Sequence, residues 1–154
     1  MKIYNVEIES KSGKILSKKI AKNLWEITEN VTIVVTTDQG CFRYIIKAGM
    51  ITDYRSGPKI ANFILPKKGR GGLYDAAIIC HDCNYFLSGK GLEFVASNKL
   101  FYTMLLFAGV SKWRAKLGFK SVSSFFGKNA FDDECWCDKI NNERSCIGFT
   151  WCDR

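Results

Sequence analysis

The sequence predicts an α+β protein in which a small antiparallel β-sheet packs against about three helices. Apolar and polar residues alternate through most of the first third of the chain, which is typical of strands half buried on one face. Three segments with helical spacing follow a loop at residues 52–72 that is rich in glycine and also contains proline. A length of 154 residues and a hydrophobic content of 47% fit one domain with a substantial core.

The strands are expected near the N-terminus. Alternation favours a strand at residues 5–10, and runs of strand-forming residues favour strands at 24–28 and 31–37. Another strand is expected at 41–49, after the glycine-containing loop TTDQG. Short turns such as KSGK predict antiparallel neighbours. The stretch ILSKKIAKNL, residues 15–24, is compatible with a short basic helix and with a strand, so its conformation is left open.

Three helices are expected in the second half of the chain. The first covers residues 73–86 and the second covers 92–108. The third begins after Ser111, a favourable N-cap, and extends to about residue 126. A glycine directly after the second and third segments predicts where each helix ends.

We expect residues 1–129 to form the α+β domain and residues 130–154 to form an irregular, acidic extension rich in cysteine and aromatic residues. Aromatic side chains there suit an interaction surface, with a packed tail as the alternative. They are Phe131, Trp136, Phe149 and Trp151. The cysteines of the extension are Cys135, Cys137, Cys146 and Cys152. Thiolates bind zinc, but paired C-x-x-C knuckles are missing, so packed thiols or, in oxidising surroundings, disulfides are the competing interpretations.

The charge of the chain is basic and unevenly distributed. The formal net charge is +8, to which residues 130–154 contribute −3 and residues 1–129 contribute +11. A basic body permits contact with nucleic acid, an acidic protein or anionic lipid, and a merely solvated lysine-rich surface is the alternative. We find neither a signal-peptide pattern nor an apolar run of about 18 residues that would span a membrane. We therefore expect a cytoplasmic protein, or a component of a particle assembled in the cytoplasm.

His81 is the only histidine in the chain and lies in the stretch IICHDCNYF. Phosphohydrolases of the HD type and H-E-x-x-H zinc proteases need more than one histidine, so both classes are excluded. On a helix, His81 and Asp82 point about 100° apart, so Asp82 cannot orient His81 as a triad acid does. In an enzyme, His81 would be a general base held by Asp53 or Asn98, and Asp82 would bind calcium or magnesium or cap a loop. The sequence requires no cofactor, and a divalent cation is compatible with it.

Asn98 lies among apolar residues of the second predicted helix, where a polar side chain needs a partner. The candidate partners of Asn98 are His81, Asp82 and the loop at residues 53–58. The structural alternative to catalysis is a buried network that joins sheet, loop and helices. Cys80 and Cys83 form a C-x-x-C pattern around the pair, but without a thioredoxin-like context packed thiols explain them better than redox chemistry.

Three segments in a fixed order carry a more specific pattern: YIIKAGMITDYRSGP, DAAIICHDCNYF and ASNKLFYTMLLFAGV. They partly match the patterns V-P-A-G-F-x-T-D-x-A-S-x-P, A-A-x-x-H-D-x-x-Y and A-D-x-x-F. The matching residues are Gly49, Thr52, Asp53, Ser56, Pro58, Ala76, Ala77, His81, Asp82, Tyr85 and Phe101. Over about residues 44–127 the chain therefore resembles DUF1353, a small domain family of unknown function found in phages and prophages.

The chain departs from the family pattern at four positions. Lys47 stands where the family pattern has a proline, and Met50 where it has a phenylalanine. Gly57 follows Ser56 at a position where the family has an aliphatic residue. Asn98 stands where the family has an aspartate. If that aspartate is a metal ligand or an acid in the family, this chain has lost affinity or activity. The resemblance implies a phage-borne protein, often encoded among virion genes, and it supplies no established reaction.

Two functions from different classes follow from these observations. One is a virion-associated structural or accessory protein that binds neighbouring particle proteins, with nucleic acid as a further partner of the basic body, located in the host cytoplasm or the virion. The other is a small hydrolase in which His81 is the general base and Asp82 or Asp53 binds a cation or orients the histidine. The single histidine and Asn98 in place of aspartate favour the first, although the sequence does not decide whether the chain is an enzyme. The structural network would contain Ser56, Tyr85 and Asn98.

Overall fold

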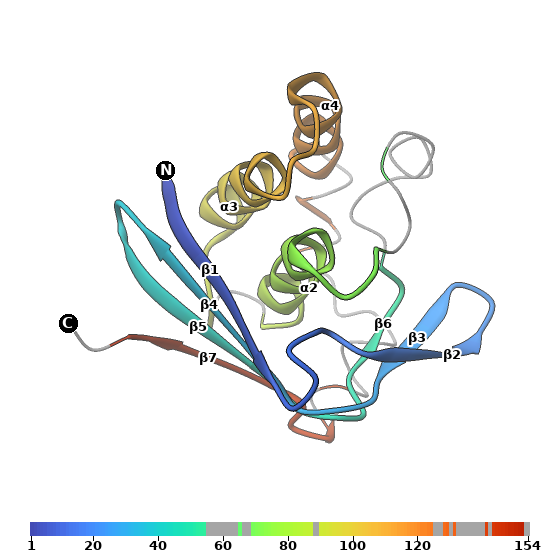
Figure 1. The fold of residues 1–154 in the computed structure, drawn as a ribbon. Helices are drawn as coiled ribbons and strands as arrows, with labels where there is room; N and C mark the ends of the chain where they lie inside the picture. The colour runs from blue at the N-terminus through green and yellow to red at the C-terminus, as the bar shows by residue number, and fades with distance from the viewer. Residues whose placement is uncertain are drawn as a thin grey trace.

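The computed structural model describes residues 1–54, 65, 69–87, 90–124, 128–129, 131, 141 and 143–152. This part of the chain has an α+β fold, with antiparallel sheets of four and three strands and three helices (Figure 1). The predicted fold class is confirmed. The strands divide between two sheets, whereas the sequence suggested one.

The four-stranded sheet has the order β1-β4-β5-β7. Its strands are β1 (Ile3–Ser10), β4 (Val31–Thr37), β5 (Gly40–Ile46) and β7 (Ile147–Trp151). Alternation in β4 places Ile33 and Val35 on one face, where their cross-strand partners Tyr44 and Phe42 also lie. All four side chains are buried, so this face forms one wall of the core beneath the helices (Figure 1).

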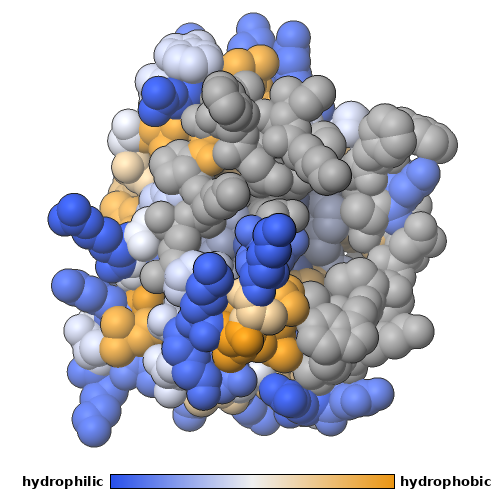
Figure 2. All heavy atoms as spheres, turned by 90° about the vertical axis from the view of Figure 1, so that its right-hand side faces the viewer, coloured by the Kyte–Doolittle hydropathy of each residue, from blue (hydrophilic) through white to orange (hydrophobic). Residues whose placement is uncertain are grey.

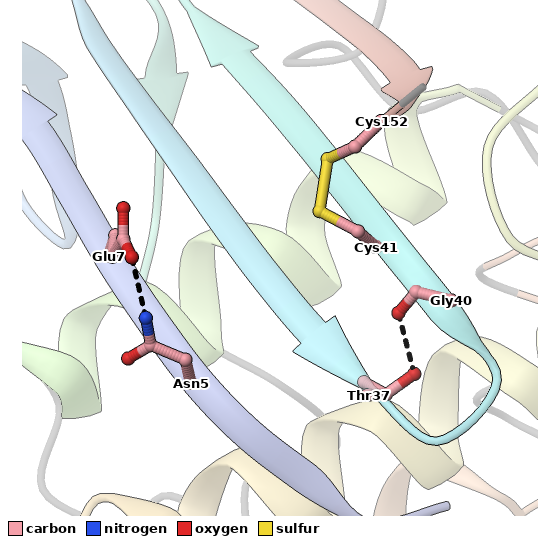
Figure 3. The surroundings of a disulfide bond; sticks show 6 residues. All are labelled: Asn5, Glu7, Thr37, Gly40, Cys41 and Cys152. Carbon is pink, nitrogen blue, oxygen red and sulfur yellow. Dashed lines mark hydrogen bonds between the residues drawn. A yellow bond between two sulfur atoms is a disulfide. The ribbon is translucent and has the colours of Figure 1, made fainter. Parts of the chain in front are cut away.

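Strand β7 lies in the extension that was expected to be irregular. It pairs antiparallel with β5, and a disulfide between Cys41 and Cys152 joins the ends of the two strands (Figure 3). The ring of Trp151 packs edge-on against Phe42, with 4.9 Å between their centroids. The strand is missed from sequence because its partner is more than 100 residues away and its own five residues give too short an alternation.

The three-stranded sheet has the order β2-β3-β6 and is formed by β2 (Ser17–Ala21), β3 (Leu24–Ile27) and β6 (Ile51–Thr52). The undecided segment at residues 15–24 therefore contains a strand, which pairs with β3. Lys18 and Glu26 lie opposite each other in this pair and form an ion pair of 3.1 Å. At the far edge, β6 buries Thr52 completely.

The helices are α2 (Leu73–Phe86), α3 (Phe94–Phe107) and α4 (Lys112–Val122). Helix α2 is central, and every residue from Asp75 to Asn84 is buried. Helix α4 ends at Val122, earlier than the predicted residue 126, and Ser124 Oγ beyond its end donates to the carbonyl of Ser121 (2.7 Å). The predicted closing glycine, residue 127, lies outside the described residues. None of the described helices is long and apolar enough to cross a membrane.

Candidate functional site

Helix α2 directs polar side chains toward three different neighbours. Successive helical residues turn by about 100°, so Asp75 and Asp82 share one face, Asn84 lies on the opposite face, and His81 lies between them. Asp82 bonds to the three-stranded sheet, Asn84 bonds to the four-stranded sheet, and His81 bonds to α3. These polar residues of α2, which we call the signature helix because it contains the stretch IICHDCNYF, therefore contact different parts of the fold. Asp75, His81, Asp82 and Asn84 are all buried.

His81 and Asn98 form the central hydrogen bond between α2 and α3. His81 Nε2 lies 2.9 Å from Asn98 Oδ1, and the His81 side chain is only 3% exposed. Asn98 Nδ2 donates to the carbonyl oxygen of Val122 at the end of α4 (3.5 Å), and the Tyr85 hydroxyl lies 3.3 Å from the same oxygen. The rings of Tyr85 and Phe101 flank the imidazole, with centroids 4.4 and 4.6 Å away. This network joins three helices at one point.

The hydrogen bonds of Asn98 determine which nitrogen of His81 carries the proton. Because the amide nitrogen donates to a carbonyl, the amide oxygen faces His81, and Nε2–H is the donor. Burial lowers the pKa of His81 from 6.5 to about 4, against a smaller upward effect of the bond to Asn98. A neutral amide cannot stabilise an imidazolium as a carboxylate would. His81 is therefore neutral at pH 7, with its basic lone pair on Nδ1.

Asp82 is bonded to the three-stranded sheet. Its Oδ2 accepts a hydrogen bond of 2.7 Å from Thr52 Oγ1, which in turn accepts one of 3.0 Å from the backbone N–H of Tyr54. Asp53 follows Thr52 in the chain and is half-buried. Ser56, the remaining residue of the expected network, lies outside the described residues. The structure thus sets His81 and Asp82 in two separate hydrogen-bonded arrangements.

Asp75 is a buried carboxylate that the sequence analysis missed. It is the third residue of α2, and its two oxygens accept hydrogen bonds from the backbone N–H groups of Gly69 (2.5 Å) and Gly71 (2.6 Å). Gly71 has a φ of +78°, and a Cβ there would lie 2.5 Å from the carbonyl oxygen of Ile15. The signal was available: an acidic residue in the first turn of a helix that follows a glycine-rich loop commonly accepts backbone N–H groups.

Tyr54 lies near both buried carboxylates. Burial raises the pKa of its phenol, and the negative charges of Asp75 and Asp82 raise it further. The hydroxyl donates to Ser17 Oγ (3.2 Å), and the ring packs edge-on against Trp25. The φ of Tyr54 is +50°, which is uncommon for a large side chain. The residue lies two positions after Thr52, the end of β6. The arrangement holds this phenol protonated between two acids.

The cysteines of the extension do not assemble as a four-ligand zinc site. Cys152 is bonded to Cys41, whereas Cys146 is a buried thiol at the other end of β7. Six residues of a strand span about 20 Å, which separates Cys146 and Cys152 too far for one ion. Cys135 and Cys137 lie outside the described residues.

Two further observations concern metal and redox chemistry among the described residues. Among the described residues, no group of three or more His, Cys, Asp or Glu side chains is placed to hold an ion. Cys80 and Cys83 are fully buried free thiols. Burial raises the pKa of both, so they stay protonated and unreactive, as expected for packed thiols.

Comparison with known proteins gives one match. A family model described as "Protein of unknown function (DUF1353)" matches residues 25–122, which extend from β3 to the end of α4. The matched region contains Thr52, Asp82, His81 and Asn98. No curated protein and no solved structure matches the chain.

Proposed function

The chain belongs to the DUF1353 family of proteins of unknown function, and from this premise we propose that it is a phage-encoded, virion-associated structural or accessory protein that binds neighbouring particle proteins. The proposal treats the signature residues as a structural network. It rests on the burial and bonding of His81, on the neutral partner that Asn98 provides, and on aromatic surface left free for contacts.

The observation that carries the proposal is the burial of His81. A general base must reach a proton on its substrate, directly or through one water molecule. His81 is almost completely enclosed between Tyr85 and Phe101, and Asn98 takes its Nε2 hydrogen bond. A pKa of about 4 also makes it a weak base. These properties suit a residue that fixes helix positions.

The two hydrogen-bonded arrangements hold the elements of the domain together. The His81–Asn98 pair joins α2 to α3 and, through Val122, to α4, while the Asp82–Thr52 pair joins α2 to β6. Leaving one buried polar partner unsatisfied costs about 1–3 kcal/mol, so each pair penalises rearrangement of its helix. A rigid frame of this kind suits a component of an assembled particle.

The extension offers surface for a neighbouring protein. Trp151 is exposed at the end of β7, an edge strand of the four-stranded sheet. Phe149 is half-buried, and Phe131 is buried against Tyr85 and Phe94, so these two pack within the domain. An exposed tryptophan on the last strand of a sheet is a common anchor for protein contacts.

Mass spectrometry of purified phage particles tests the proposal. We expect the chain in a constant ratio to the capsid protein across preparations. A Trp151→Ala variant should be incorporated less, although the purified full chain, which loses the ring contact with Phe42, still unfolds cooperatively in a thermal melt. Tyr4→Ala, which also truncates an exposed aromatic residue, is the matched control and should be incorporated normally. Absence of the chain from particles would contradict the proposal.

A second candidate is the small hydrolase in which His81 is the general base and Asp82 or Asp53 binds a divalent cation or orients the histidine. One observation favours this candidate. The hydrogen bond to Asn98 keeps the proton of His81 on Nε2, which leaves the lone pair of Nδ1 available to act as a base. In catalytic sites a third residue often orients the base in the same way. A His81→Gln phage separates the candidates. If the variant chain folds and is incorporated but infectivity is lost, the hydrolase is supported and the purely structural role is contradicted.

A further inference from the structure

Helices α3 and α4 share an exposed face on the outside of the molecule. On α3, Val95, Lys99, Tyr102 and Leu106 follow each other at intervals of four, three and four residues, so they form one stripe. The ring of Tyr102 packs against Phe119 of α4, with 5.6 Å between centroids. This contact places the stripe of α3 directly beside α4.

Helix α4, which contacts α3, also has an exposed side with apolar and basic residues. Its buried side consists of Ala115, Gly118 and Val122. Trp113, Lys116, Leu117 and Lys120 lie on the opposite side, at i, i+3, i+4 and i+7, and all four are exposed. Trp113 is 58% exposed and Leu117 40% exposed, whereas Val95 at the start of α3 is 62% exposed. Large apolar side chains therefore stand in solvent among lysines.

The two helices carry cationic side chains and no acidic ones of their own. Residues 95–124 contain no aspartate or glutamate. Their five cationic side chains are all exposed, and they are Lys99, Lys112, Arg114, Lys116 and Lys120. At the top of the space-filling view, where Figure 1 places α4, hydrophilic side chains stand beside hydrophobic ones (Figure 2). Charge complementarity therefore points to an anionic partner.

The apolar residues decide which anionic partner fits. Nucleic acid offers phosphates to lysine and bases that stack on tryptophan, but it gives exposed Val95, Leu106 and Leu117 no apolar phase to enter. Exposed tryptophan and aliphatic residues surrounded by lysines are the composition of helices that bind at a bilayer surface. We propose that the α3–α4 face binds the surface of a membrane that contains anionic phospholipid. Trp113 and Leu117 enter the boundary between headgroups and acyl chains, and the lysines contact the phosphates.

Co-sedimentation of the full chain with vesicles tests the proposal. Vesicles of phosphatidylcholine with one-third phosphatidylglycerol should bind the wild type, and vesicles of phosphatidylcholine alone should not. Each lysine near an anionic surface is worth about 1 kcal/mol, so Lys116→Glu with Lys120→Glu should weaken partitioning about 30-fold or more. Trp113→Ala with Leu117→Ala should weaken it several-fold and remove a blue shift of tryptophan fluorescence. All four positions are exposed, and thermal melts check that the variants fold.

The matched control reverses the same amount of charge elsewhere. Lys19 and Lys22 are exposed on and next to β2, so Lys19→Glu with Lys22→Glu changes the net charge equally without touching the α3–α4 face. The control should retain at least half of the vesicle binding. An equal loss in the control, binding to oligonucleotides without binding to vesicles, or no binding to either overturns the proposal.

Discussion

His81 Nε2 donates a 2.9 Å hydrogen bond to Asn98 Oδ1, and neither partner carries a charge at pH 7. The pattern A-D-x-x-F, which the sequence partly matches, would place an aspartate at the position of Asn98. A carboxylate there would favour the imidazolium form of the histidine, whereas the amide leaves burial as the dominant influence on its pKa. The amide of Asn98 therefore gives a neutral pair that is suited to the interior of the domain.

Replacing the amide by a carboxylate should reverse the protonation of the pair. In Asn98→Asp the carboxylate would lie about 3 Å from the ring, and we expect the pKa of His81 to rise above 6.5. The chain has one histidine, so a single set of imidazole signals in a long-range ¹H–¹⁵N NMR titration reports the change. Asn98→Ala, which removes the hydrogen bond without adding charge, should keep the pKa low. A pKa that stays near 4 in Asn98→Asp would show that the two side chains do not meet.

The stability of the wild type should fall as the pH decreases from 6.5 to 4. Over this range the unfolded chain protonates His81 at its usual pKa of 6.5, while the folded chain resists protonation until about pH 4. The difference corresponds to roughly 3 kcal/mol of unfolding free energy, present above pH 6.5 and lost by pH 4. Urea unfolding of the wild type and of His81→Gln measures it. The two proteins should differ in their pH dependence, and parallel curves would count against a buried histidine.

Removing the hydroxyl of Thr52 should destabilise the fold. Thr52→Val leaves the buried Asp82 oxygen without its 2.7 Å donor and the Tyr54 N–H without its acceptor, at a cost of about 2–4 kcal/mol. Thr52→Ser keeps the hydroxyl and should lose about 1 kcal/mol or less. Chemical denaturation measures both variants. Equal losses would mean that the methyl group, rather than the hydrogen bonds, stabilises this position.

A methyl group at Gly71 should disturb the loop that Asp75 holds. Both Gly71 and Gly109 have positive φ, of +78° and +84°, so alanine at either costs about 1 kcal/mol in backbone strain. At Gly71 the added Cβ would also lie 2.5 Å from the carbonyl oxygen of Ile15, whereas at Gly109 nothing lies within 4 Å. Gly71→Ala should therefore cost about 1–3 kcal/mol more than Gly109→Ala in thermal or urea unfolding. Equal effects would contradict the close approach of this loop to Ile15.

Local signals predicted the elements whose stability is largely local. The bounds of α2 follow from a glycine-rich loop before a helical apolar pattern, and β4 follows from a run of β-branched residues. Strand β7 could not be predicted, because five residues acquire their structure from pairing with β5 and from the bond between Cys152 and Cys41. Pairing between residues more than 100 positions apart in the sequence cannot be predicted from a local pattern.

Part of the candidate site was also predictable from local sequence, because a polar residue among apolar ones needs a buried partner. Asn98 among apolar residues required a buried partner, and His81, one helix earlier in the chain, provides it. For Asp82 the sequence predicted a bound cation or a loop that it caps, and the structure shows a hydrogen bond from Thr52, the last residue of β6. The sequence places Thr52 at the start of the loop at residues 52–72, and only its position beside α2 in the fold gives its hydroxyl a hydrogen-bond partner.

The pKa of His81 in the folded wild-type protein is the most direct test of the structural role proposed for the signature helix. Its imidazole signals should titrate with a pKa of about 4 and should not shift when calcium or magnesium is added. A pKa near 6.5 or above, or a shift on adding either cation, would place His81 in contact with solvent or an ion and would contradict the structural role.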